Sequence, residues 1–163
     1  MPKNTKEWET EPDHVFFTHK NFLCEIKRND FLSLCGYVYI PKTHSLYRKH
    51  YDDIDVRVHG GLTFSDMVLD QWCIGFDCGH AGDLAPAMKT LFRSPLYHDK
   101  DVYRNVKYVN DELVQLVDQI IKDYTSEEEL ERYKDTIRSD IAHALLSDPQ
   151  AAYLDTLGNA RMT

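Results

Sequence analysis

Residues 52–83 read DDIDVRVHGGLTFSDMVLDQWCIGFDCGHAGD, and the rest of the predicted fold is built around them. Two runs rich in β-branched, aromatic and other apolar residues, 54–59 and 72–77, predict strands. Each strand leads directly into a turn of small and polar residues, which is His59-Gly60-Gly61 in the first case and residues 77–83 in the second. Glycine, histidine and aspartate gather in this way nowhere else in the chain, so we expect any functional site to lie at these two turns.

The first predicted strand alternates polar with branched apolar residues. Because successive side chains of a strand point to opposite faces, Asp55, Arg57 and His59 form a polar row while the other face packs on the core. The glycines that follow can adopt positive φ and let the backbone approach a ligand closely. Successive amides in such a turn can point at one anion, so Gly60 and Gly61 are candidates for an anion-binding loop.

Further strands are predicted on both sides of this turn. Residues 21–27 and 32–40 are apolar runs separated by a turn at residues 28–30, which is the pattern of an antiparallel hairpin. Residues 62–64 continue or restart a strand after the first turn, and residues 65–70 are a connection. Residues 84–101 show little periodicity and predict a long loop with one short helix near residues 87–92.

The C-terminal third of the chain has helical patterning. From Asn105 to Tyr124, apolar residues recur at helical spacing with charged residues on the opposite side. Ser126 and Glu129 then match a capping box, and a second helix is predicted to run to Leu146. The chain is therefore predicted to adopt an α+β fold, in which one long helix covers a mostly antiparallel sheet of about four strands and a second helix lies C-terminal to it.

The same patterns divide the chain into three parts. Residues 1–14 predict a flexible tail, residues 15–124 form the α+β core domain with both turns, and residues 125–163 form a C-terminal helical extension. Within the extension, residues 150–163 are expected to form a last short helix or to fray. A length of 163 residues suits one such core domain, and 42% hydrophobic with 28% charged residues is typical of a folded globular protein.

The composition excludes some classes of partner. A net charge of −8 argues against nonspecific nucleic-acid binding, which needs a broad basic surface. No apolar run reaches the about 18 residues of a membrane span and no signal peptide is visible, so we expect a cytoplasmic protein that does not bind membranes. The cysteines include no CxxC pair and are expected to be buried thiols: Cys24, Cys35, Cys73 and Cys78.

Recognition of a small anionic ligand of nucleotide type is the first function that the turns predict. An arginine fork and glycine amides suit phosphate oxygens, and carboxylates can accept hydrogen bonds from a ribose or a base. The basic loop at residues 42–50 leads into this stretch and adds positive charge. The predicted ligand-binding residues are Arg57, His59, Gly60, Gly61, Thr63, Asp77, His80 and Asp83.

A hydrolase that acts on a nucleotide or another phosphate ester is the second prediction. Imidazoles and carboxylates can hold a divalent metal ion that activates a water molecule, and a histidine–aspartate pair can act as a general base without metal. The sequence does not specify which cofactor, if any, is bound. The catalytic residues of this alternative are His59, Asp77, His80 and Asp83.

The turns also allow a purely structural arrangement. Asp77 can cap the Ala81 or Gly82 amide as an Asx turn, and His59 can donate to that carboxylate and hold the two loops together. The turns can equally meet across a homo-oligomer rather than within one chain. A zinc site of Cys73, Cys78 and His80 would need a fourth ligand from elsewhere, Cys35 or His59, and buried cysteines explain this grouping better.

Several segments of the chain resemble a group of small proteins frequent in bacteriophage and prophage sequences. The likeness rests on LCGYV at residues 34–38, Pro41, VHGGLTF at residues 58–64, Trp72, GFDCGHAGD at residues 75–83, and Tyr108-Val109. It covers residues 22–121, and both halves of the motif pair occur in order at close spacing. The matching site positions are His59, Gly60, Gly61, Thr63, Asp77, Cys78, His80, Gly82 and Asp83.

The resemblance implies a phage-type accessory protein that works in the host cytoplasm. Small phage proteins of this kind often counter host defences, and some of them sequester nucleotide signals. The resemblance therefore favours binding of a nucleotide-like ligand over hydrolysis. A further alternative is an inhibitor of a host enzyme that acts by protein–protein contact.

Overall fold

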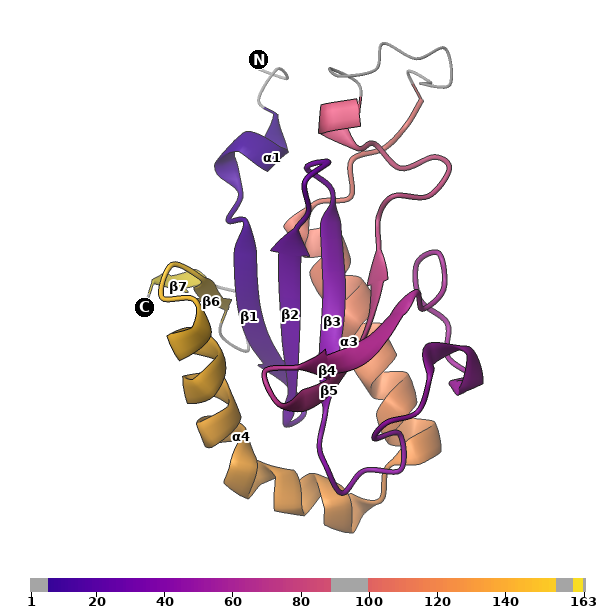
Figure 1. The fold of residues 1–163 in the computed structure, drawn as a ribbon, viewed down its shortest axis with the longest axis vertical. Helices are drawn as coiled ribbons and strands as arrows, with labels where there is room; N and C mark the ends of the chain where they lie inside the picture. Colours follow the sequence, from indigo (N-terminus) through magenta and orange to yellow (C-terminus); the bar gives the residue numbers. More distant parts are fainter. Residues whose placement is uncertain (1–5, 89–99, 155–159, 163) are drawn as a thin grey trace.

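The structure, a computed structural model, describes residues 6–88, 100–154 and 160–162 and belongs to the α+β class (Figure 1). The helical elements are α1 (Glu7–Thr10), the 3-10 helix η1 (Tyr51–Asp53), α3 (Val106–Tyr124) and α4 (Glu127–Ser147). The strands are β1 (His14–His19), β2 (Phe22–Arg28), β3 (Leu34–Ile40), β4 (Phe64–Val68), β5 (Gln71–Asp77), β6 (Ala152–Leu154) and β7 (Ala160–Met162).

These strands form one mixed sheet in the order β4-β5-β3-β2-β1-β6-β7. The predicted hairpin is confirmed, because β2 and β3 pair antiparallel and form the centre of the sheet. The predicted number of four strands is wrong: β1, β6 and β7 extend the sheet on one side of the hairpin. The sheet is mixed because β6 pairs parallel to β1, whereas the other neighbours run antiparallel.

Helix α3 covers one face of the sheet, as its amphipathic pattern predicts. Its buried stripe is Val109, Leu113, Leu116, Val117 and Ile120. A Cβ on Gly36 of β3 would lie 3.0 Å from the Val109 Cγ1 atom and 2.7 Å from the Phe76 ring, so this glycine lets the helix approach the strand closely.

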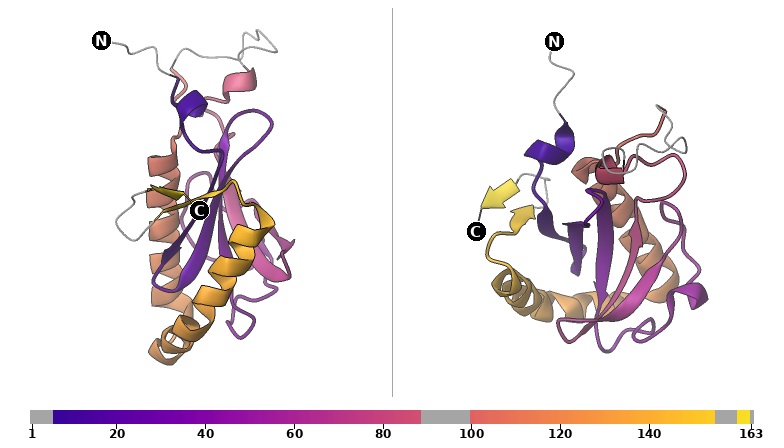
Figure 2. Two further views of the ribbon diagram at one scale, coloured as in Figure 1. Left: turned by 90° about the vertical axis from the view of Figure 1, so that its left-hand side faces the viewer. Right: turned by 45° about the horizontal axis from the view of Figure 1, so that its top comes forward.

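Helix α4 lies against the other face, so the sheet is sandwiched between the two helices (Figure 2). Phe16, Leu23, Tyr39 and Cys73 point to this side and form a second apolar cluster with Ala144 of α4, among others. The predicted capping box is confirmed, since Ser126 accepts from the Glu129 amide while the Glu129 side chain accepts from the Ser126 amide. This cap fixes the sharp reversal from α3 into α4.

Residues 54–58 do not form the predicted strand. Ile54 is buried and Val56 and Val58 pack on the core, so the apolar half of the alternation was interpreted correctly. The backbone, however, pairs with side chains of α3 instead of a neighbouring strand. Its hydrogen bonds join Asp55 N to Tyr124 Oη, Gln119 Oε1 and Nε2 to the Arg57 N and O atoms, and His59 N to Glu112 Oε1.

The edge of the sheet beside β5 is occupied by β4 instead. Residues 65–68 belong to this strand and not to a connection, because their register with β5 continues from Phe64 opposite Gly75 to Val68 opposite Gln71. At the other edge, β6 follows α4 where a short helix or a frayed end was expected. The expected N-terminal tail contains α1 and ends where β1 begins at His14.

Two remaining expectations concern the loop after β5 and the membrane. The short helix predicted near residues 87–92 falls mainly on residues 89–99, which lie outside the described residues. Within the described ranges, every helix is too short or too polar to cross a bilayer.

Candidate functional site

The two predicted turns lie side by side at the end of the sheet where α3 begins. The His59 and His80 rings are 6.0 Å apart between centroids. Gly60 has a φ of +68°, and a Cβ at this position would lie 2.2 Å from the His80 Nε2 and Cδ2 atoms. Only glycine permits this contact, so the glycine of the first turn is what allows the second turn to pack against it.

A closed set of contacts between four side chains links the turns to α3; we call it the Asp83 network, and its members are Asp83, His59, Tyr108 and Arg104. His59 Nε2 lies 2.8 Å from Asp83 Oδ2, and His59 Nδ1 lies 2.7 Å from the Tyr108 hydroxyl. Arg104 Nε donates to Asp83 Oδ1 at 2.9 Å, and its guanidinium lies over the Tyr108 ring at 4.9 Å. Each member therefore contacts two others.

Asp83 is the charged centre of this network. Its side chain is 1% exposed. Burial alone would raise the pKa of this carboxyl, but hydrogen bonds from His59, Arg104 and the His80 amide outweigh burial and lower the pKa. The hydrogen bond between Asp83 and Arg104 is also the main cause of the raised pKa of Arg104. Asp83 is thus an ionised carboxylate that fixes an arginine and a histidine in place.

A second pair of side chains, Asp77 and His80, lies nearer the surface. Asp77 Oδ1 accepts from the Gly79 amide at 2.9 Å, so Asp77 forms an Asx turn, but with Gly79 and not with the predicted Ala81 or Gly82. Asp77 Oδ2 accepts from the Thr63 hydroxyl at 2.9 Å, and the predicted contact of His59 is made with Asp83 instead of Asp77. His80 Nε2 lies 3.3 Å from Asp77 Oδ1, a charge contact without hydrogen-bond geometry. Both side chains are 34% exposed. This pair is therefore partly exposed, in contrast to Asp83, although the His80 Nε2 atom itself is buried and makes no hydrogen bond with the described residues.

The remaining predicted residues are placed less favourably for an anion-binding loop. The Gly61 amide donates to Val58 O, so it is not free for a ligand. Arg57 is exposed, and its guanidinium makes no ion pair with the residues that the structure describes. The predicted pair of free glycine amides is therefore not present in the first turn.

The basic loop at residues 42–50 does not reach the turns. It begins after β3 ends at Ile40, which pairs with Trp72, whereas Asp77 pairs with Cys35 at the opposite end of the same strand. A cavity of about 480 Å³ lies at the loop's end of the sheet, lined by Ile40, Pro41, Lys42, Thr43, Gln71, Arg132, Tyr133, Asp135, Thr136 and Asp140. This cavity is separate from the predicted site.

Arg104 and Tyr108 belong to the site but were not among the predicted site residues. Both lie at the start of α3, where Asn105 is the N-cap and accepts from the Tyr108 amide. A parallel bridge between Asp83 and Val102 brings this region beside the second turn. The start of the α3 helix was the available signal in the sequence. It marks the point at which the chain returns to the core after a long loop, so residues near it were candidates for the site.

The Asp83 network does not suit a metal ion. Both Asp83 oxygens already accept hydrogen bonds, one of them from a guanidinium whose positive charge would repel a cation. Among the residues described, no group of three or more His, Cys, Asp or Glu side chains is arranged to hold a metal. Cys73 and Cys78 are buried, and burial raises the pKa of both thiols, which argues against the zinc alternative.

Comparison of the chain with protein-family models, with curated proteins and with solved structures finds no match.

Proposed function

We propose that this protein binds a small anionic ligand of nucleotide type at the paired turns. The observation that carries the proposal is the arrangement of Arg104. Its Nε atom is held by the buried Asp83 carboxylate and its planar face lies on the Tyr108 ring, while its side chain remains 26% exposed. In the part of the chain that the structure describes, its terminal amino groups make no hydrogen bond.

An arginine held in this way is prepared for an anion. Ordering a free arginine costs side-chain entropy, and an orienting carboxylate and aromatic face reduce the entropy still to be lost on binding. The two terminal amino groups present a planar fork that matches phosphate oxygens. Exposed Arg57 adds positive charge on the neighbouring segment. Asp77 and Thr63 then offer an acceptor and a hydroxyl to the sugar or base of a nucleotide.

Calorimetric titration with a panel of mononucleotides and cyclic dinucleotides tests this proposal. We expect wild-type protein to bind at least one of them, and Arg104→Ala to weaken that binding about tenfold or more, as expected for loss of a charge-assisted contact. Lys107→Ala is the matched control: this lysine is three residues away, is 82% exposed, and forms an ion pair with Asp111. No binding by wild type, or equal loss in both variants, contradicts the proposal.

The resemblance to small phage proteins supports a biological setting for this ligand. A counter-defence protein that sequesters a nucleotide signal in the host cytoplasm needs tight binding without turnover. Ligand recovered intact after heat release from the protein is the expected result, and recovery of a cleaved product contradicts sequestration.

A hydrolase without metal is the second candidate, and one contact favours it. In the neutral tautomer with the proton on Nε2, His59 donates to Asp83 and its Nδ1 accepts from the Tyr108 hydroxyl. This is the geometry in which a histidine can act as a general base. Product formation from the panel nucleotides that Tyr108→Phe and His59→Gln both abolish would favour this candidate over sequestration.

A further inference from the structure

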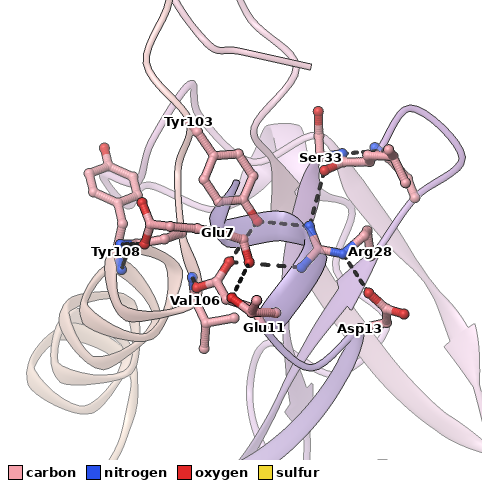
Figure 3. Close-up of polar contacts among 12 residues, drawn as sticks. Glu7, Glu11, Asp13, Arg28, Ser33, Tyr103, Val106 and Tyr108 are labelled. Atoms are coloured by element: carbon pink, nitrogen blue, oxygen red, sulfur yellow. Dashed lines mark hydrogen bonds and ion pairs between the residues drawn. The ribbon is translucent and has the colours of Figure 1, made fainter. Parts of the chain in front are cut away.

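A second anion-binding arrangement lies at the N-terminus of α3, and the chain's own Glu11 occupies it (Figure 3). Glu11 Oε2 accepts from the Val106 amide at 2.8 Å, in the first turn of the helix. Glu11 Oε1 accepts from the Tyr103 hydroxyl at 2.7 Å. A helix of 19 residues presents positive potential and unpaired amides at this end, which suits an anion.

Arg28 from the end of β2 supplies the positive charge of this site. Its side chain is 5% exposed, and its Nη1 atom donates to the Tyr103 hydroxyl at 2.7 Å. The Nη2 atom faces Glu11 Oε1 at 3.8 Å but makes no hydrogen bond. An unsatisfied amino group on a buried guanidinium is unfavourable, so Glu11 fills this site incompletely.

Charge dominates the attachment of the segment that carries Glu11. Residues 7–13 read EWETEPD, with four acidic side chains and no basic one. Helix α1 has no buried residue. Apart from polar contacts, the segment is held by Trp8 against the Tyr103 ring, at 5.1 Å between centroids. With so little buried apolar surface, the segment depends on its polar contacts, which include Arg28 Nε to Asp13 at 2.7 Å and Asn105 Nδ2 to Glu7 at 2.9 Å. An anion that replaces the Glu11 contacts therefore competes with polar contacts and not with a packed core.

Residues 7–13 are here called the acidic strap. We propose that its Glu11 carboxylate occupies a binding site for an external phosphoryl group, and that Arg28, Tyr103 and the N-terminus of α3 form this site. A carboxylate has two oxygens, which are used by Tyr103 and Val106. A phosphoryl group has a third terminal oxygen, which can accept from the free Arg28 Nη2 atom. The ligand class is a small phosphorylated molecule that competes with Glu11. This site is distinct from the Asp83 network, although Tyr103 and Arg104 are adjacent in the chain.

Titration with inorganic phosphate at constant ionic strength tests the proposal. Glu11→Gln keeps the size of the side chain and removes its charge, so we expect it to bind phosphate about tenfold more tightly than wild type and to gain thermal stability as phosphate is added. Glu9→Gln is the matched control, since Glu9 is 62% exposed and lies 4.0 Å from Lys6. The control should respond to phosphate as wild type does.

Three further arms make the result decisive. Glu11→Asp keeps the charge but shortens the reach, so it decides the question if Glu11→Gln does not fold; it should bind phosphate more tightly than wild type. Acetate, with two oxygens, should bind Glu11→Gln more weakly than phosphate. Glu11→Gln should gain phosphate affinity whether or not wild type binds any panel nucleotide, which separates this proposal from the proposed function. Equal phosphate affinity in the Glu11 and Glu9 variants, or equal affinity for acetate and phosphate, would overturn it.

Discussion

Two buried histidine–carboxylate networks of this molecule differ in the groups that surround the histidine. His14 of β1 lies between two carboxylates, with Nε2 against Glu25 and Nδ1 2.6 Å from Asp148. His59 lies between one carboxylate, Asp83, and the hydroxyl of Tyr108. Both rings are largely buried, with side chains 12% and 13% exposed.

The partners determine which hydrogen bonds each ring can make. Two carboxylates can both be satisfied only by a protonated His14 that donates from both nitrogens, which ties β1, β2 and the end of α4 together. The carboxylate and the hydroxyl beside His59 make no such demand, because a hydroxyl can donate or accept. The first network is saturated by its own groups. The Asp83 network contains Arg104, whose side chain is 26% exposed and uses its Nε atom for Asp83.

Replacement of His14 should produce the largest effect on stability. His14→Gln leaves Glu25, which is 7% exposed and also accepts from Tyr39, without its positive partner. We expect a loss of about 3 kcal/mol in the free energy of unfolding, as for one partner removed from a buried ion pair. Urea unfolding measures it, with exposed His143→Gln of α4 as the control. Equal stability of the two variants would show that His14 is not the proposed lock.

Replacement of Asp83 should cost less, about 2 kcal/mol. Asp83→Asn removes the charge but keeps the shape, and Arg104 can turn toward water because it is already 26% exposed. Asp77→Asn on the same turn should lower the free energy of unfolding by about 1 kcal/mol at most, since this carboxylate is 34% exposed. Urea unfolding measures both losses, and a larger loss of stability in Asp77→Asn than in Asp83→Asn would contradict this comparison.

The pH dependence should separate the two networks, with a smaller effect because titration removes charge and not atoms. Burial alone would lower the pKa of His14, but its hydrogen bonds to Glu25 and Asp148 outweigh burial and raise the pKa above 6.5. The stabilisation from His14 is therefore complete below pH 6.5 and is lost as the pH rises through the raised pKa.

Asp83 should behave in the opposite way. Its pKa lies below the usual 3.8, so its stabilisation is complete above pH 3.8 and is lost as the pH falls through the lowered pKa. Unfolding free energies of wild type, His14→Gln and Asp83→Asn across the pH range check both directions. The difference between wild type and His14→Gln should shrink on the alkaline side, and that between wild type and Asp83→Asn on the acidic side. The reverse pattern would contradict the assignment of charges.

The elements that sequence patterns predicted well are those whose partners are local. The α3 stripe, the Ser126 capping box and the β2–β3 hairpin follow from spacings within a few residues. Residues 54–58 were predicted as a strand because their polar and apolar side chains alternate. Alternation indicates which side chains face the core, but it does not indicate which groups form hydrogen bonds with the backbone. Side chains of α3 do so here, from positions more than fifty residues away.

The candidate site shows the same limit. Gly60 and His80 could be grouped from the sequence because each belongs to a conspicuous turn, and the structure places these turns in contact. Arg104 could not, because it follows a long aperiodic stretch and reaches Asp83 only through the bridge between Asp83 and Val102. Strand β6 was missed because it has three residues, too few for a recognisable alternation.

The most direct test of the central claim, that Asp83 prepares Arg104 for an anion, is a double-mutant cycle on ligand affinity. Calorimetry would compare wild type, Asp83→Asn, Arg104→Ala and the double variant, with the panel nucleotide that binds wild type most tightly. We predict that Asp83→Asn weakens binding about tenfold in wild type and has little further effect once Arg104 is absent. Equal weakening by Asp83→Asn in both backgrounds, or no binding by wild type, would contradict the account.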